Sequence, residues 1–193
     1  YSPSDVAECN KQAIDFLATL RKAAGYDLVV LSANVGPRSD AYQAQDRMTV
    51  DAAETYHAEQ MHALPETETD VVTAMTLTYS EEAAGIIRAA KRYNLPVVAS
   101  FTVETDGLLP TGQSLRDAIE QVDKDTGSYA EHFMINCAHP DHFDNILDDA
   151  MQTGRLKGLV ANASRCSHEE LDNAQELDDG DPAELAEQLI SLK

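Results

Sequence analysis

The sequence contains no tryptophan, only three cysteines and few basic residues among its 193 positions. It has 14 lysines and arginines against 34 aspartates and glutamates, which gives a formal net charge of -20 at pH 7. A surface with this charge repels the phosphates of nucleic acids, so we expect no nucleic acid partner. The acidity alone does not indicate which other partner the chain has.

Disulfides and membrane spans are not expected either. Three cysteines are too few and too far apart for a disulfide framework, which favours the reducing cytoplasm. No early segment combines the basic residues and the apolar run of a signal peptide. The longest apolar runs, 28–31 and 95–99, are far shorter than the roughly 20 residues that cross a bilayer, so we expect no membrane contact. The oligomeric state is left open.

Short apolar segments alternate with segments of helical period along the whole chain, which is typical of an α/β fold. The alternation continues without a linker, so residues 1–193 are expected to form a single domain. It fits either an open doubly wound sheet or a segment of an eightfold barrel, and the glycine-rich phosphate motif of the first is missing. The five expected strands are 27–32, 71–75, 95–102, 132–136 and 156–161.

Capping residues and periodicity predict where the helices lie. The first helix is expected over 4–24, ended by Gly25, and the second over 41–64. Ser80 and Ser114 are expected to cap the next two helices, and Pro140 to occupy the first turn of the one after. The last helix is expected to have Asp181 as its cap and Pro182 as its first residue.

Polar residues gather where the expected strands end, and both architectures place their active sites at that edge. Asn136 and Cys137 follow the fourth strand, and a cysteine thiolate is a ligand that zinc prefers. A lone cysteine at a strand end is also commonly a small core residue. Glu104 and Asp106, after the third strand, suit a general base or a group that binds an ammonium, although a solvated acidic turn is the simpler interpretation.

The remaining cysteines and histidines are interpreted as structural or exposed. Cys9 falls on the apolar stripe of the first helix, and Cys166 lies in a polar loop. His57 and His62 are five residues apart on a helix and therefore on different faces, where both are expected to be exposed. His142 is expected to point outward from the first turn of its helix.

Three further segments carry a family signature. They read Asn-Val-Gly-Pro at 34–37, Ser-Phe-Thr-Val-Glu-Thr-Asp-Gly-Leu-Leu-Pro-Thr-Gly-Gln-Ser-Leu at 100–115, and Ile-Asn-Cys-Ala-His-Pro at 135–140. In this order they resemble the zinc-dependent homocysteine S-methyltransferases, and the resemblance extends over nearly the whole chain. It implies a (β/α)8 TIM barrel in which Cys137 is the first of three zinc-binding cysteines. It also implies methyl transfer from a cationic donor, such as S-methylmethionine, to the zinc-bound thiolate of homocysteine, giving methionine.

The chain departs from the family pattern in three places. Nothing matches the Gly-Gly-Cys-Cys motif that carries the other two zinc cysteines, and the first two strands have no counterpart before residue 1. About five of the eight βα units are therefore expected, and segments of the natural protein are expected to be absent from this sequence. Met75 stands where the family places a Glu that holds the amino group of homocysteine; Glu104 is the candidate to compensate, and otherwise the acceptor differs.

The sequence thus predicts a methyltransferase whose partners are a small-molecule thiol acceptor and a methyl donor. Cys137 is the expected zinc ligand, and Asn136, Thr102 and Glu104 are the expected substrate pocket. One rival is a metal-independent barrel enzyme that uses Glu104 or Asp106 as a base. Another is a catalytically inactive barrel remnant that acts as a binding module.

Overall fold

The computed structural model describes residues 2–26 and 28–192. These residues form five strands and seven α-helices that alternate along most of the chain, together with one short 3-10 helix, Leu64–Glu66. The elements are α1 (Pro3–Ala24), β1 (Ser32–Val35), α2 (Val50–Met61), β2 (Val71–Leu77), α3 (Ser80–Arg92), β3 (Val97–Phe101), α4 (Leu115–Thr126), β4 (His132–Ala138), α5 (Pro140–Met151), β5 (Leu156–Ala161), α6 (His168–Asn173) and α7 (Pro182–Ser191).

The order of the strands decides between the two expected architectures. All five strands are parallel, and they pair in chain order from β1 to β5. A doubly wound sheet reverses its strand order part-way, because its connections pass over both faces. Here each strand pairs with the next one in the chain, as in the wall of a (β/α)8 barrel. The fold is therefore α/β and corresponds to part of a TIM barrel.

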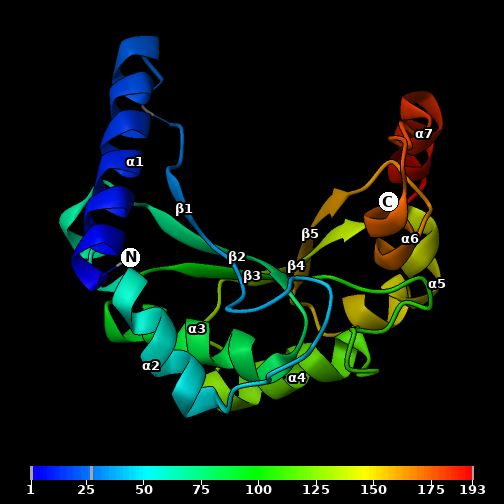
Figure 1. The fold of residues 1–193 in the computed structure, drawn as a ribbon, viewed down its shortest axis with the longest axis horizontal. Coiled ribbons are helices and arrows are strands. Elements are labelled where there is room, and N and C mark those ends of the chain that lie inside the picture. Colours follow the sequence, from blue (N-terminus) through cyan, green and yellow to red (C-terminus); the bar gives the residue numbers. More distant parts are fainter. Residues whose placement is uncertain (1, 27, 193) are drawn as a thin grey trace.

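The helices are confined to one side of this wall and to its two ends. Figure 1 shows α2, α3 and α4 below the sheet, α1 beside β1, and α5, α6 and α7 beside β5. The opposite face of the sheet carries no helix of the described residues in this view. Strand side chains thus pack under helices on the outer face and line the concave inner face.

Residue type follows this division, because successive side chains of a strand point to opposite faces. The inner face of β3 and β4 is polar towards the carboxyl ends, where Ser100, Thr102 and Asn136 are buried. The side chains that alternate with them are apolar and almost completely buried: Val72, Ala74, Ala99, Phe101, Phe133 and Ile135. The polar end of the inner face is where the candidate site forms.

The first strand differs from its prediction over 27–32. The structure has β1 at Ser32–Val35, and residues 28–30 are apolar but exposed and outside any strand. Asp27 lies outside the described residues. The strand begins late because the Asp70 carboxylate accepts the Leu31 N–H at 2.8 Å, and the ladder with β2 starts one residue further on.

The second helix is also shorter than predicted over 41–64. It begins at Val50, where the Thr49 hydroxyl accepts the Ala52 N–H. Ahead of it, the Asp40 carboxylate accepts the N–H groups of Tyr42 and Gln43, and this local turn competes with a helix. Residues 38–49 therefore form an irregular segment over the sheet edge, which we call the β1–α2 segment.

The other predicted helix starts are largely confirmed. Ser114 caps α4, and Pro140 occupies the first turn of α5. Asp181 caps α7, with Pro182 as its first residue. Ser80 is the first helical residue of α3 and not its cap. Helix α6 was not predicted, and within residues 2–26 and 28–192 no helix is long and apolar enough to cross a membrane.

Candidate functional site

Strands β2 and β4 both break their regular pairing just before they end. The register shifts between Ala74 and Leu77 in β2, and between Asn136 and Ala138 in β4. Each irregularity contains a residue with left-handed backbone, Thr76 with φ 61° and Cys137 with φ 56°. Non-glycine residues adopt this region at a cost, and such residues are concentrated at functional sites. At the two bulges, the side chains of Thr76 and Cys137 therefore depart from the regular alternation between the two faces of the sheet.

The completely buried side chain of Asn136 joins the two bulges. Its Oδ1 accepts the Thr76 N–H at 2.9 Å, and its Nδ2 donates to Thr76 Oγ1 at 2.8 Å. The same Nδ2 lies 3.0 Å from Cys137 Sγ. Asn136 therefore both shapes the strand ends and holds the sulfur.

Tyr42, from the β1–α2 segment, interacts with the same cysteine. Burial of the phenol, its hydrogen bond with Cys137 and the nearby negative charges of Cys137, Asp172 and Asp40 raise the pKa of Tyr42 to about 12. Tyr42 therefore stays protonated across the physiological range. A protonated phenol is a second potential hydrogen-bond donor to the sulfur.

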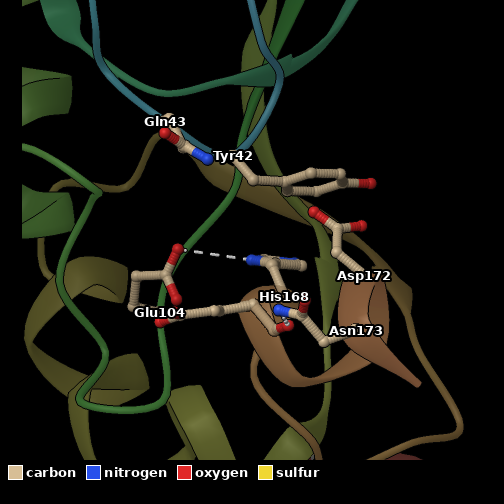
Figure 2. A pocket seen from close by; sticks show the side chains of 7 residues that line it. Tyr42, Gln43, Glu104, His168, Asp172 and Asn173 are labelled. Carbon is tan, nitrogen blue, oxygen red and sulfur yellow. Dashed lines mark hydrogen bonds and ion pairs between the residues drawn. The ribbon is translucent and has the colours of Figure 1, made fainter.

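His168, the first residue of α6, lies under the Tyr42 ring. The two rings stack with centroids 4.0 Å apart and planes inclined by 24°. His168 Nε2 lies 2.7 Å from the Cys137 carbonyl oxygen, and Nδ1 lies 3.3 Å from Glu104 Oε1. Figure 2 shows Glu104 reaching this imidazole from the opposite side to Asn173 and Asp172. Segments after β1, β3 and β5 thus meet above the end of β4.

A cavity of about 450 Å³ opens beside this stack. It is acidic, because carboxylates from α6 and from the loop after β3 line it, and no lysine or arginine of residues 2–26 and 28–192 does. Such a lining favours a cationic ligand over an anionic one. The residues that line it are Tyr42, Gln43, Glu104, His168, Glu169, Asp172 and Asn173.

The sequence matches a known protein family. The family model described as homocysteine S-methyltransferase matches residues 1–191, nearly the whole chain. The chain belongs to the homocysteine S-methyltransferase family. No curated protein matches it by sequence search.

Solved structures of the homocysteine methyltransferase MmuM from Escherichia coli share the fold. The metallated form aligns with a TM-score of 0.67 and 15% identity, over 83% of this chain and 67% of MmuM. The apo form gives a TM-score of 0.64 and 15% identity, over 100% of this chain and 76% of MmuM. The oxidised form gives 0.65 and 17%, over 100% and 73% respectively. At this identity the likeness supports the fold and not the residues of the site.

Zinc, the metal of this family, needs more ligands than Cys137. The described residues contain no group of three His, Cys, Asp or Glu side chains placed to share one ion. The two nearest histidines in sequence have other partners: His139 Nδ1 accepts the Asp141 N–H at 3.1 Å, and His142 Nε2 lies 2.9 Å from the Arg165 carbonyl oxygen. These residues do not complete a zinc site.

The four predicted site residues lie at one end of the sheet. Asn136, Cys137 and Glu104 belong to the connected cluster around His168. Thr102 ends the inner face of β3; it is fully buried, and its hydroxyl has no hydrogen-bond partner among the described residues. A buried hydroxyl without a partner is uncommon and is available to a ligand. Asp106, the other candidate base, is exposed, and its carboxylate accepts the Leu108 N–H.

Two histidines predicted to be exposed are buried. His142 is 8% exposed because α5 packs it against the carbonyl oxygen of Arg165. His57 is 3% exposed, and its Nε2 lies 3.0 Å from Glu82 Oε1 of α3, itself 1% exposed. Helical spacing alone does not reveal a buried charged partner on another helix.

Cys9, predicted on the buried stripe of α1, is exposed because that stripe is narrow: Ile14 and Ala18 alone are buried on α1.

The His57–Glu82 pair also holds the β1–α2 segment that carries Tyr42. Glu82 Oε1 accepts the Arg38 N–H at 2.8 Å, and the Tyr79 hydroxyl accepts the Met48 N–H at 3.1 Å. Burial alone raises the pKa of Glu82, but hydrogen bonds from His57, Arg38 and Tyr79 outweigh it and leave this pKa below its ordinary value. Glu82 is therefore ionised at neutral pH and anchors the Arg38 end of the segment, while Tyr79 anchors the Met48 end.

Sequence reasoning missed Tyr42 and His168. His168 had a local signal, because Ser167 and Glu170 form a capping box that marks the start of α6. Tyr42 had no signal of its own, since its role depends on a stack between segments far apart in the chain.

Proposed function

We propose that this chain acts in methyl transfer from a cationic donor to the thiolate of homocysteine, giving methionine. With S-methylmethionine as donor, a sulfonium–methyl bond breaks and a sulfur–methyl bond forms on homocysteine. The sulfonium keeps the electron pair of the broken bond and becomes a second methionine. The thiol proton of homocysteine passes to solvent before attack.

The observation that carries the proposal is the placement of Cys137. Its sulfur has an amide donor from Asn136 at 3.0 Å, and its carbonyl oxygen lies 2.7 Å from Nε2 of His168, which lines an acidic cavity at the carboxyl ends of the strands. Barrel enzymes place their chemistry at this edge. We propose that Cys137 is the zinc ligand contributed by the described part of the chain; zinc, when bound, would supply a lowered thiol pKa for the acceptor.

The cavity supports a cationic donor. Glu104, Glu169 and Asp172 give its lining a negative potential, and the Tyr42 ring offers an aromatic face to a sulfonium or ammonium group. Closing such a donor against the sulfur of the acceptor would place the two reactants in line. We propose that Glu104 and the hydroxyl of Thr102, which has no partner among the described residues, bind polar groups of the substrates. Glu104 would take the role of the family's Glu at the position where this chain has Met75.

The test is methionine formation from isotope-labelled homocysteine, followed by mass spectrometry. S-methylmethionine, betaine and a methylfolate are offered in turn, with zinc present. We expect labelled methionine with a cationic donor, and Cys137→Ser to abolish it and to lower the zinc content. Cys166→Ser, a change of the same chemistry in a surface loop, is the control. Equal zinc content and equal turnover in the two variants would refute the role of Cys137.

The substitution Glu104→Gln distinguishes the metal-independent rival from the proposed methyltransferase. A general base contributes about 10²–10⁴-fold, so the rival predicts a fall of that size in kcat. Donor binding instead predicts a raised donor KM with a smaller change in kcat. Asp106→Asn tests the rival's other candidate base in the same assay, and Asp144→Asn, at an exposed carboxylate of α5 outside the cavity, is the control. The binding-module alternative predicts no turnover with any donor.

The remaining expectations also stay proposals. We propose that residues 1–193 form one domain, because β1 to β5 share one sheet. We propose a cytoplasmic location, because all three cysteines are free thiols. Small molecules are the partners that the cavity suits.

A further inference from the structure

The backbone of Cys137 is strained at a point where the ladder between β4 and β5 does not hold it. Its φ of 56° lies in the left-handed region, which a cysteine rarely adopts. The register between β4 and β5 is interrupted at this residue, between Asn136 and Ala138. Left to relax, the residue would return to an extended conformation, and its Sγ would leave the Asn136 amide.

His168 is placed to provide that restraint. Its Nε2 lies 2.7 Å from the Cys137 carbonyl oxygen, and a carbonyl only accepts hydrogen bonds, so Nε2 carries the proton. The ring is fixed from two other directions, by Glu104 at Nδ1 and by the stacked ring of Tyr42 (Figure 2). Its side chain is 11% exposed, so water competes little for the bond.

We propose that His168 is the positioning residue for Cys137: through the Cys137 carbonyl it holds the left-handed turn that keeps Sγ against Asn136. The inference takes its functional meaning from the proposed role of Cys137 in methyl transfer. The hydrogen bond from His168 to the Cys137 carbonyl, which we call the clamp, requires neither metal nor substrate.

Two substitutions test the roles of the two ring nitrogens of His168 separately. In His168→Gln the side-chain amide can donate from the position of Nε2 and keep the bond to the Cys137 carbonyl. In His168→Asn the amide reaches only the position of Nδ1, so it can face Glu104 but not Cys137. His168→Phe keeps a ring under Tyr42 and loses both polar contacts. His62→Asn, at an exposed histidine, is the control.

The first readout is the alkylation rate of Cys137 by iodoacetamide, in a full-length chain with Cys9→Ser and Cys166→Ser. We expect the rates of His168→Asn and His168→Phe to differ from the parent's by about tenfold, because Sγ leaves its place beside the Asn136 amide. His168→Gln and His62→Asn should react within about twofold of the parent. The second readout is the ¹³Cα resonance of labelled Cys137, which should leave its left-handed position in the Asn and Phe variants and keep it in the Gln variant.

Circular dichroism establishes that each variant is folded before its rate is compared. A rate in folded His168→Asn within about twofold of the parent's, or a change in His168→Gln as large as in His168→Asn, would overturn the inference. If the Asn and Phe variants fail to fold, ¹⁵N spectra of the parent decide, because an unprotonated Nε2 on His168 excludes the clamp.

The outcome is independent of catalysis. Alkylation requires no zinc, donor or homocysteine, so a chain that shows this pattern but forms no methionine refutes the proposed function alone. A chain that forms methionine but shows no difference between the Asn and Gln variants refutes the clamp alone.

Discussion

Thr76 and Cys137 lie 61 residues apart in the chain and are joined through one buried amide, that of Asn136. Both have left-handed backbone at a bulge, so the strain of two strand ends is stabilised by the same side chain. An asparagine suits this position because it donates and accepts at once. A carboxylate would accept from the Thr76 N–H and have nothing to donate to the sulfur.

Asn136→Ala should therefore be severely destabilising. It removes three hydrogen bonds and leaves the Thr76 N–H without its acceptor in a buried site. We expect the free energy of unfolding to fall by about 3 kcal/mol. Urea denaturation measures the difference, with Asn145→Ala on the exposed face of α5 as the control. A loss no larger than the control's would contradict the bridging role.

Local signals explain what the sequence predicted well. The caps at Ser114 and Asp181 and the proline at position 140 act within one helical turn, so a single sequence is enough to read them. The cluster of Asn136, Cys137 and Glu104 was foreseeable because parallel strands end at one edge. Strand order followed from the family resemblance.

Non-local partners explain what was missed. The apolar residues 28–30 looked like a strand, yet a strand exists only where a neighbour pairs with it, and pairing begins at Ser32. The burial of His57 depends on Glu82, 25 residues away, and the stack of Tyr42 on His168 joins two loops. No periodicity within either segment encodes these contacts.

Glu82 supplies a second prediction, on stability. In Glu82→Gln the partner of buried His57 loses its charge, and the acceptor for the Arg38 N–H weakens. We expect a loss of about 2 kcal/mol in unfolding free energy at pH 7. Glu81→Gln is the matched control, because its ion pair with Arg47 is partly exposed and such pairs are worth about 0–1 kcal/mol.

The same loss should depend on pH. The pKa of Glu82 is lower in the folded chain than its ordinary value of 4.5, so ionised Glu82 stabilises the fold above that value. As the pH falls below 4.5, the unfolded chain takes up the proton first, and the contribution is lost as the pH passes through the folded pKa. The difference between the parent and Glu82→Gln should therefore shrink in acid. A difference that is constant from pH 7 to pH 4 would exclude this ion pair as its source.

Gly85 tests the packing of α2 on α3. A Cβ at this position would lie 2.3 Å from Ala53 Cβ and 2.7 Å from the Glu54 backbone nitrogen. Alanine is the better helix former by about 1 kcal/mol, yet the clash moves backbone, so we expect Gly85→Ala to destabilise by about 2 kcal/mol. Gly36→Ala, where the new Cβ meets nothing within 4 Å, should be close to neutral in the same thermal unfolding experiment. Equal melting temperatures for the two variants would contradict the close approach of these helices.

The protonation of Tyr42 can be measured directly. Its pKa is raised to about 12 by burial, by the hydrogen bond with Cys137 and by the charges of Cys137, Asp172 and Asp40. The ultraviolet difference between the parent and Tyr42→Phe should therefore show no phenolate at pH 10.5, where a free tyrosine amide, with a pKa of about 10, is mostly ionised. Circular dichroism at that pH establishes that the fold persists.

Cys137→Ser separates the causes of this shift. It removes the thiol and its charge and leaves the burial of the ring unchanged, so we expect the pKa of Tyr42 to fall part of the way towards the free value. A complete return would mean that the sulfur alone raises it, and no change would mean that the phenol and the thiol are not in contact. In that last case the stack on His168 would hold Tyr42 for a reason other than the sulfur beneath it, and the assignment of Tyr42 to the site around Cys137 would have to be withdrawn.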